Sequence, residues 1–266
     1  MSGSKEEPPS PAAGRPAWET CLGPDALVAT DEYHHGYNAI LLDILRRPPR
    51  RVLELGCAAG RLAQALRERH PGVHHTGIEM NAGAATIARS RMDRVIEARL
   101  EDIDFAAEGL ADGSIDTFIA GDVLEHMVDP WRALLRVRPL LSEGAQVAIS
   151  IPNVRNLGIH AMLHNEGTWR YDTHGLLDIT HVRFFALRDI MRMLEETGYQ
   201  PVDVKSNLDP RFAAFYEQNA GKASVSLSAG RMKLDNVSML ELQEYCTLQF
   251  IVLAQPAPRA GSAPAA

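Results

Sequence analysis

Short apolar runs alternate along the chain with longer amphipathic runs. The first kind includes RRVLEL, GVHHTGIE, DRVIEA, IDTFIAGD and QVAISIP, and the second includes RLAQALRERH, AATIARSR and WRALLRVRPLL. The first kind has the composition of buried strands, and the second has the spacing of helices with one apolar face. Because strands that alternate with helices pair in parallel through crossover connections, this order predicts a doubly wound α/β fold.

Further elements complete the predicted sheet. A helix is expected at 37–47, before the first strand, and another at 187–199, where Gly198 suits the helix C-terminus. Two more strands near 201–206 and 246–254 bring the number of strands to about seven. We therefore expect a mostly parallel seven-stranded sheet.

Two segments, 153–186 and 207–244, do not follow the alternation. Long connections in compact domains are usually functional lids or disordered, so we expect both as insertions into a single domain that spans 18–254. The ends of the chain, 1–17 and 255–266, are rich in Pro, Ala, Gly and Ser and poor in large apolar residues. This composition predicts disordered tails.

Composition narrows the class of protein. The chain has 266 residues, of which 45% are hydrophobic and 23% charged, and its formal net charge is −7. The negative charge argues against nucleic acid or an anionic membrane as a general partner. The three cysteines, Cys21, Cys57 and Cys246, form no C-x-x-C pair, so neither a disulfide framework nor a zinc site is expected from them. No apolar run suits a signal peptide or a membrane span, which predicts a soluble, cytoplasmic protein.

The stretch RVLELGCAAGRL at 51–62 is the first sign of a ligand. Here small residues, including Gly56 and Gly60, follow a buried strand and open a helix, so backbone N–H groups are left bare for close approach. Glu79 closes the second strand about 20 residues later, at the spacing of an acid that takes both hydroxyls of a ribose. This spacing fits NAD and S-adenosylmethionine equally.

Two charged residues distinguish between these two candidate ligands. A dinucleotide fingerprint requires a small third residue for tight helix–strand packing, and that position holds Arg61. Glu54, inside the first strand, suits a ligand ammonium group better than a pyrophosphate.

At this point the sequence resembles a known family. E-L-G-C-A-A-G resembles motif I, (D/E)-x-G-x-G-x-G, of the class I S-adenosylmethionine-dependent methyltransferases, with Ala58 in place of the middle glycine. The likeness continues through GIEMN, DTFIAGDVLEHMVDPW and LLSEGAQVAISIPN, over roughly residues 33–200. The stretch from SIPNVRN to MLEETGY further resembles a bacterial branch that acts in glycan or secondary-metabolite biosynthesis. The resemblance implies a Rossmann-like methyltransferase fold with cap insertions and S-adenosylmethionine as the cofactor.

The resemblance also implies roles for individual residues. Glu54 is expected at the methionine moiety, Glu79 at the ribose and Met80 beside the adenine. Arg99 stands where the family has an acid that meets the adenine amine, so this contact is left open between Glu101, Asp102 and the backbone of Leu100. The remaining cofactor contacts are expected from the motif I turn and from the end of the fourth strand, at Gly56, Cys57, Ala58, Gly60, Asp122 and Val123.

Candidate catalytic residues come from the end of the fourth strand and from the first insertion. In this fold the acceptor meets the methyl group beyond the fourth strand, so His126 is the first candidate for a general base, with His181 and His174 behind it. Glu125 is expected to be structural. The insertion holds four histidines with spacings of four, ten and seven, which match no compact metal site, so no metal is expected.

Other residues of the insertion are expected to hold it or to bind the acceptor. Asp178 and His181 are expected to pin the loop, while Phe184 and Phe185 pack into the core. The substrate-binding candidates are the aromatic residues Trp169 and Tyr171, together with Tyr33, which precedes the first helix.

The sequence favours O-methylation of a hydroxylated small molecule, with the segments 207–244 and 153–175 forming a cap over the acceptor. N- or C-methylation remains open, as does a catalytically silent cofactor-binding subunit that partners an active enzyme. A dinucleotide oxidoreductase is least favoured because of Arg61. An oligomer of identical chains is also left open.

Overall fold

A seven-stranded sheet forms the centre of the molecule. The computed structural model describes residues 21–22 and 36–258, so the predicted tail 1–17, most of the tail 255–266 and the candidate Tyr33 lie outside the described residues. The strand order is β3-β2-β1-β4-β5-β9-β6, and β9 alone runs in the direction opposite to the other six strands. The strands are β1 (Arg51–Leu55), β2 (His74–Glu79), β3 (Arg94–Glu97), β4 (Ile115–Gly121), β5 (Leu141–Pro152), β6 (Tyr199–Leu208) and β9 (Thr247–Pro256).

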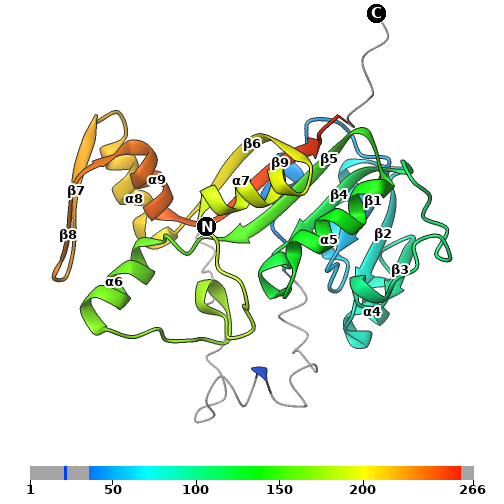
Figure 1. Cartoon of the computed structure of the whole chain (residues 1–266), viewed down its shortest axis with the longest axis horizontal. Helices are drawn as coiled ribbons and strands as arrows, with labels where there is room; N and C mark the ends of the chain where they lie inside the picture. The colour runs from blue at the N-terminus through cyan, green and yellow to red at the C-terminus, as the bar shows by residue number, and fades with distance from the viewer. Residues whose placement is uncertain (1–20, 23–35, 259–266) are drawn as a thin grey trace, which may run out of the picture.

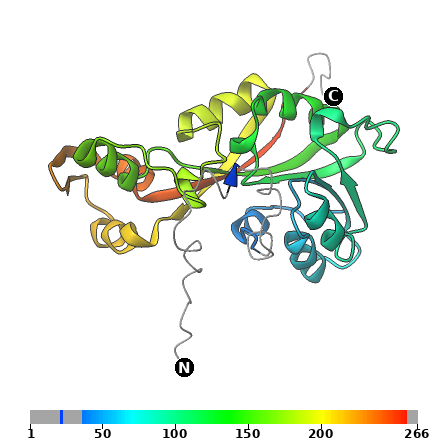
Figure 2. The same cartoon turned by 90° about the horizontal axis from the view of Figure 1, so that it is seen from below.

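Helices cover both faces of this sheet, as Figures 1 and 2 show. One face carries α2 (Ile40–Asp43), α3 (Arg61–Arg69) and α4 (Ala82–Ala88), and the other carries α5 (Pro130–Val137) and α7 (Leu187–Glu196). Short 3-10 turns lie at Leu100–Asp102, Leu124–His126, Arg138–Leu140 and Gly175–Leu177. The predicted doubly wound α/β fold is confirmed.

The sheet is buried on both faces, which explains its near-continuous apolar strands. Leu53, Phe118 and Ile149 pack beneath α5 and α7, whereas Val52 and Ile119 pack beneath α2 and α3. Among the described residues, no helix is long and apolar enough to cross a membrane.

Some element boundaries differ from those expected. The helix expected at 37–47 is only α2, because the chain turns at Ile44 before two prolines. Strand β9 continues to Pro256 by pairing with Tyr199 of β6, and Ala257 still donates a hydrogen bond to Gly198. The prediction of a disordered tail from residue 255 is therefore wrong at its first residues, because sheet pairing orders them.

The second insertion is folded rather than loop-like. It contains α8 (Pro210–Asn219), β7 (Ser224–Ala229), β8 (Met232–Ser238) and α9 (Met239–Cys246), and the first insertion adds α6 (Leu157–Glu166). These elements lie together at the left of Figure 1, and β7 and β8 form a separate two-stranded sheet. Buried Leu157, Leu227, Met232 and Leu242 give this lobe its own apolar cluster.

Candidate active site

The loop after β1 has the conformation that its small residues predict. Gly56, Ala58 and Gly60 have φ angles of 69°, 46° and 74°, all in the left-handed region. A Cβ atom added to Gly56 would lie 2.9 Å from Cγ2 of Val123, which follows β4. Ala58 therefore adopts the backbone of the glycine that it replaces, although an L-residue pays about 1–2 kcal/mol for that conformation.

Glu79 ties this loop to the next one. It is 8% exposed at the end of β2, where its Oε2 accepts a hydrogen bond from the N–H of Ala58 at 2.9 Å. Its Oε1 accepts from the N–H of Asn81 at 2.8 Å. Each carboxylate oxygen keeps a lone pair, so the group can accept two further hydroxyl donors.

Glu54 and Cys57 are both buried. Glu54 is buried beside His75, whose Nε2 lies 2.8 Å from Glu54 Oε2 without the alignment of a hydrogen bond. The Cys57 thiol packs against Met92 and Ala88, and burial, together with the charges of Glu54 and Glu79, raises its pKa. The N–H of Cys57 donates to the carbonyl of Ile78, so the cofactor contacts of Cys57 and of Glu54 stay predictions.

The loops after β2 and β3 lie side by side because Glu79 and Glu97 pair in register. Met80 is 57% exposed at this edge. Leu100 is buried, while Glu101 and Asp102 are exposed, and Glu101 lies 3.9 Å from Arg99. The choice between these residues as the adenine contact stays open.

Asp122 follows β4 with a φ angle of 52°. Its Oδ1 accepts hydrogen bonds from the hydroxyl of Ser150 at 2.8 Å and from the amide of Gln249 at 2.7 Å. Gln249 in turn accepts from Asn38 and Asn207. The sequence did not indicate this polar network, because its members lie on five separate segments and share no motif.

His126 and His181 meet although 54 residues separate them. Their ring centroids are 4.7 Å apart in an edge-to-face arrangement. The loop that carries His181 is held at the end of β4, because the N–H groups of Val182 and Arg183 donate to the carbonyl of Glu125 at 2.9 and 3.0 Å. His181 lies 4.0 Å from the Glu125 carboxylate.

Both imidazoles are neutral near pH 7. Burial lowers the pKa of His126. Burial and the neighbouring His126 lower the pKa of His181 to about 4. Burial, with the nearby charges of Asp122 and Asp178, raises the pKa of Glu125 well above its ordinary value. The cluster therefore offers unprotonated imidazole nitrogens at the edge of the sheet where parallel α/β folds bind ligands.

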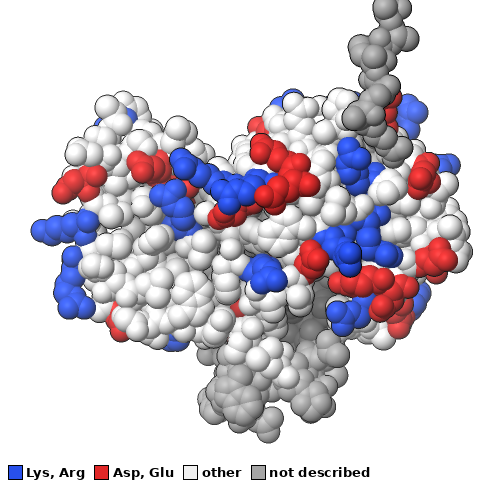
Figure 3. Space-filling model, viewed as in Figure 1, with Lys and Arg blue, Asp and Glu red and all other residues white. Residues whose placement is uncertain are grey.

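The other candidates of the first insertion fall into two groups. Trp169 packs edge to face on Phe184 at 5.0 Å, and Phe184 lies 6.3 Å from His181, so Trp169 belongs to the surroundings of the histidine pair. Tyr171 is 45% exposed, and His174 is exposed and lies next to Thr173. The surface over this segment in Figure 3 carries few charges. Phe185 is buried as expected. The prediction that Phe184 packs into the core is wrong, because this residue is 36% exposed and packs on Trp169 instead.

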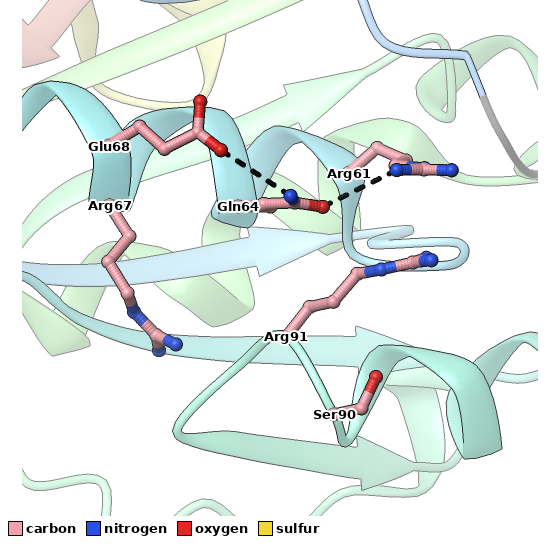
Figure 4. A pocket seen from close by; sticks show the side chains of 6 residues that line it. All are labelled: Arg61, Gln64, Arg67, Glu68, Ser90 and Arg91. Carbon is pink, nitrogen blue, oxygen red and sulfur yellow. Dashed lines mark hydrogen bonds between the residues drawn. The ribbon is translucent and has the colours of Figure 1, made fainter.

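Arg61 does not face the crevice at the strand ends. Figure 4 shows it in a shallow pocket on the side of α3, where it donates to Gln64 at 3.4 Å. Arg91 lies nearby and donates to the carbonyl of Ala59 at 2.6 Å. This pocket contains none of the predicted site residues.

Comparison with known proteins agrees with this geometry. A family model described as a methyltransferase domain matches residues 30–204. An uncharacterized transposon protein of Streptomyces fradiae is 31% identical over 134 residues, half of this chain, but the match spans only 39% of that protein. A malonyl-[acyl-carrier protein] O-methyltransferase of Geobacter sulfurreducens is 25% identical, with 69% of this chain and 70% of that protein aligned. A ubiquinone biosynthesis O-methyltransferase of Aromatoleum aromaticum is 27% identical, with 64% and 74% aligned.

A solved structure shows the same fold. The protein of Thermotoga maritima described as an S-adenosylmethionine-dependent methyltransferase, possibly acting on histamine nitrogen, superposes with a TM-score of 0.55. Its sequence identity is 18%, and the superposition covers 91% of this chain and all of that one.

Proposed function

Because the chain belongs to the class I S-adenosylmethionine-dependent methyltransferases, we propose that it transfers the methyl group to a hydroxyl oxygen of a small molecule. The cofactor follows from the family. The acceptor and the residues that serve it are the proposal.

The residues present fit S-adenosylmethionine. Glu79 has lone pairs for the two ribose hydroxyls, and the loop of Gly56, Ala58 and Gly60 has no side chain that blocks close approach. The carboxylates of Glu79 and Asp122 lie at the carboxyl ends of β2 and β4, and their negative charge suits a cofactor that carries an ammonium and a sulfonium. The exposed side chain of Met80 can cover an adenine face. S-adenosylmethionine supplies an activated methyl group when bound.

The observation that carries the proposal is the neutral histidine pair beyond β4. A hydroxyl is a poor nucleophile until its proton leaves, and a positioned imidazole can contribute about 10²–10⁴ in rate to that step. His126 and His181 provide nitrogens that are unprotonated near pH 7 at the place where the fold meets its acceptor. An amine acceptor needs such a group much less.

The chain's remaining contribution is alignment. Methyl transfer is an in-line displacement, and holding the two reactants in line can supply about 7–11 kcal/mol of the barrier. Glu79 and the loop after β1 fix one reactant. The acceptor is proposed to bind to Trp169, Tyr171 and Tyr33. The segments 153–175, which carries Trp169 and Tyr171, and 207–244 are proposed to form the cap over it. Two relatives are named as O-methyltransferases, which supports oxygen as the acceptor atom.

Paired acceptors test the proposal. Phenols or sugars would be compared with analogues in which an amine replaces the hydroxyl, and the methylated atom would be located by mass spectrometry and NMR. We expect O-methyl products, and in His126→Asn a turnover about 10²–10⁴-fold lower with S-adenosylmethionine affinity nearly unchanged. His74→Asn is the matched control, because His74 is exposed at the start of β2, at the opposite end of the sheet. Methyl groups found on nitrogen or carbon would contradict the proposal, and cofactor binding without transfer to any acceptor would favour the silent subunit.

A further inference from the structure

Three side chains that can bind a metal ion face one another beyond β4. Glu125, His126 and His181 each offer one ligand atom, and these atoms lie within 4.8 Å of one another. Glu125 and His181 are buried, and His126 is half-buried. The three ligand atoms are close enough to share one metal ion.

Neighbouring oxygens determine which imidazole nitrogens are free. The hydroxyl of Thr180 donates its single proton to Asp178 at 2.6 Å, so it must accept from Nδ1–H of His126, which lies 3.0 Å away. The carbonyl of Leu176, 3.3 Å from Nδ1 of His181, can only accept as well. Both rings therefore carry their proton on Nδ1 and present a lone pair at Nε2.

The side chain of Glu125 is buried without a hydrogen-bond partner in the described part of the chain. It is 1% exposed, and neither carboxylate oxygen has a hydrogen-bond partner among the described residues. The nearest imidazole atom, Nε2 of His181, is 4.0 Å away and is itself an acceptor. Burial without partners disfavours the ionised form of a carboxyl group, and a cation bound to it stabilises that form.

We propose that Glu125, His126 and His181 bind one divalent cation of the zinc class. Two imidazoles and one carboxylate, with one position left for a further ligand, are the donor set of catalytic zinc sites, whereas Mg²⁺ prefers oxygen donors. The Asp178–Thr180–His126 chain and the Leu176–His181 bond supply the outer partners that orient metal-binding histidines. Donor atoms at about 2.0–2.2 Å from a zinc ion require the cluster to close by about 1 Å, which side-chain rotation can provide.

This inference rests on the proposed function and refines it. An ion at the cluster lowers the pKa of an acceptor hydroxyl that it binds, so the proton passes to water and the imidazoles serve as ligands. The hydroxyl oxygen then forms the bond to the methyl carbon, while the bond from methyl to sulfur breaks and its electron pair stays on sulfur. His126 thus holds the ion instead of taking the proton itself.

The test measures metal binding separately from turnover. The full chain would be stripped with a chelator and titrated with Zn²⁺ against a chromophoric competitor, and with Co²⁺ by visible absorption. We expect one ion per chain, a Co²⁺ spectrum of four or five ligands, and no competition from equimolar Mg²⁺. Thr180→Val should lower Zn²⁺ affinity about 10–100-fold, and His181→Asn and Glu125→Gln by more. His74→Asn should bind Zn²⁺ as the wild type does.

Two results would overturn the inference. One is a wild type that binds no stoichiometric Zn²⁺ or Co²⁺, a result that needs no variant to fold. The other is His181→Asn binding Zn²⁺ with unchanged affinity. O-methylation that persists in the metal-free chain would support the proposed function and exclude a catalytic role for the ion. His126 would then act as the base. One tightly bound ion in a chain that methylates only nitrogen would support the metal site and contradict the proposed function.

Discussion

Replacing Glu79 with alanine tests the cofactor site most directly. The change removes the acceptor proposed for the ribose hydroxyls and also the partner of the Ala58 and Asn81 N–H groups. A hydrogen bond to a charged group is worth about 1.5–3 kcal/mol, which predicts S-adenosylmethionine binding that is about 10- to 150-fold weaker. Unfolding should also become easier, since Ala58 loses a bond that holds its left-handed conformation, but water can reach both N–H groups at the edge of the sheet.

Titration calorimetry with S-adenosylmethionine and a 2′-deoxy analogue separates the two effects. In the wild type the deoxy analogue should bind more weakly than the cofactor, and in Glu79→Ala this difference should vanish, because the partner of the missing hydroxyl is gone. Glu97→Gln is the control, since Glu97 ends the adjacent strand β3 but pairs with Arg89 at 2.6 Å. Unchanged affinity in folded Glu79→Ala, or a deoxy penalty that persists there, would refute the ribose assignment.

Two further predictions concern backbone and charge. Gly60→Val should abolish cofactor binding and lower the melting temperature, because φ at Gly60 is 74° and an added Cβ would lie 3.2 Å from Cα of Ala88; a fully active variant would contradict the role of the loop after β1. Asp209→Asn should cost about 1–3 kcal/mol of unfolding free energy, because buried Asp209 accepts from Asn156 at 3.0 Å and from Arg211 at 2.6 Å. Burial opposes the ionised form of Asp209, but these bonds prevail and lower its pKa, so its contribution is present above the unfolded-state pKa and is lost as pH falls through the folded-state pKa. Melting curves from pH 7 to pH 3 should show this acid-dependent loss of stability in the wild type and a smaller loss in the variant. Parallel curves would contradict a stabilising role for the ionised Asp209 side chain.

The local parts of the site were predictable from sequence. The strand, turn and helix around Gly56 and Gly60 are contiguous, so residue type and spacing determine their conformation, and Glu79 follows at the distance that one crossover requires. The alternation of apolar and amphipathic runs likewise predicts the order of strands and helices along the chain, because the central strands are buried on both faces.

Only the tertiary structure brought together the remaining groups. Glu125 and His126 meet His181 because backbone bonds from Val182 and Arg183 to Glu125 dock two distant loops, and no spacing among the histidines of one segment could indicate this. Asp122 meets Gln249, 127 residues away, through the antiparallel strand β9. The helices and strands of the second insertion also depend on tertiary contacts, since Leu157 from the first insertion packs into their apolar cluster. Contacts of this kind depend on how separate elements pack, and the local periodicity of the sequence does not determine that packing.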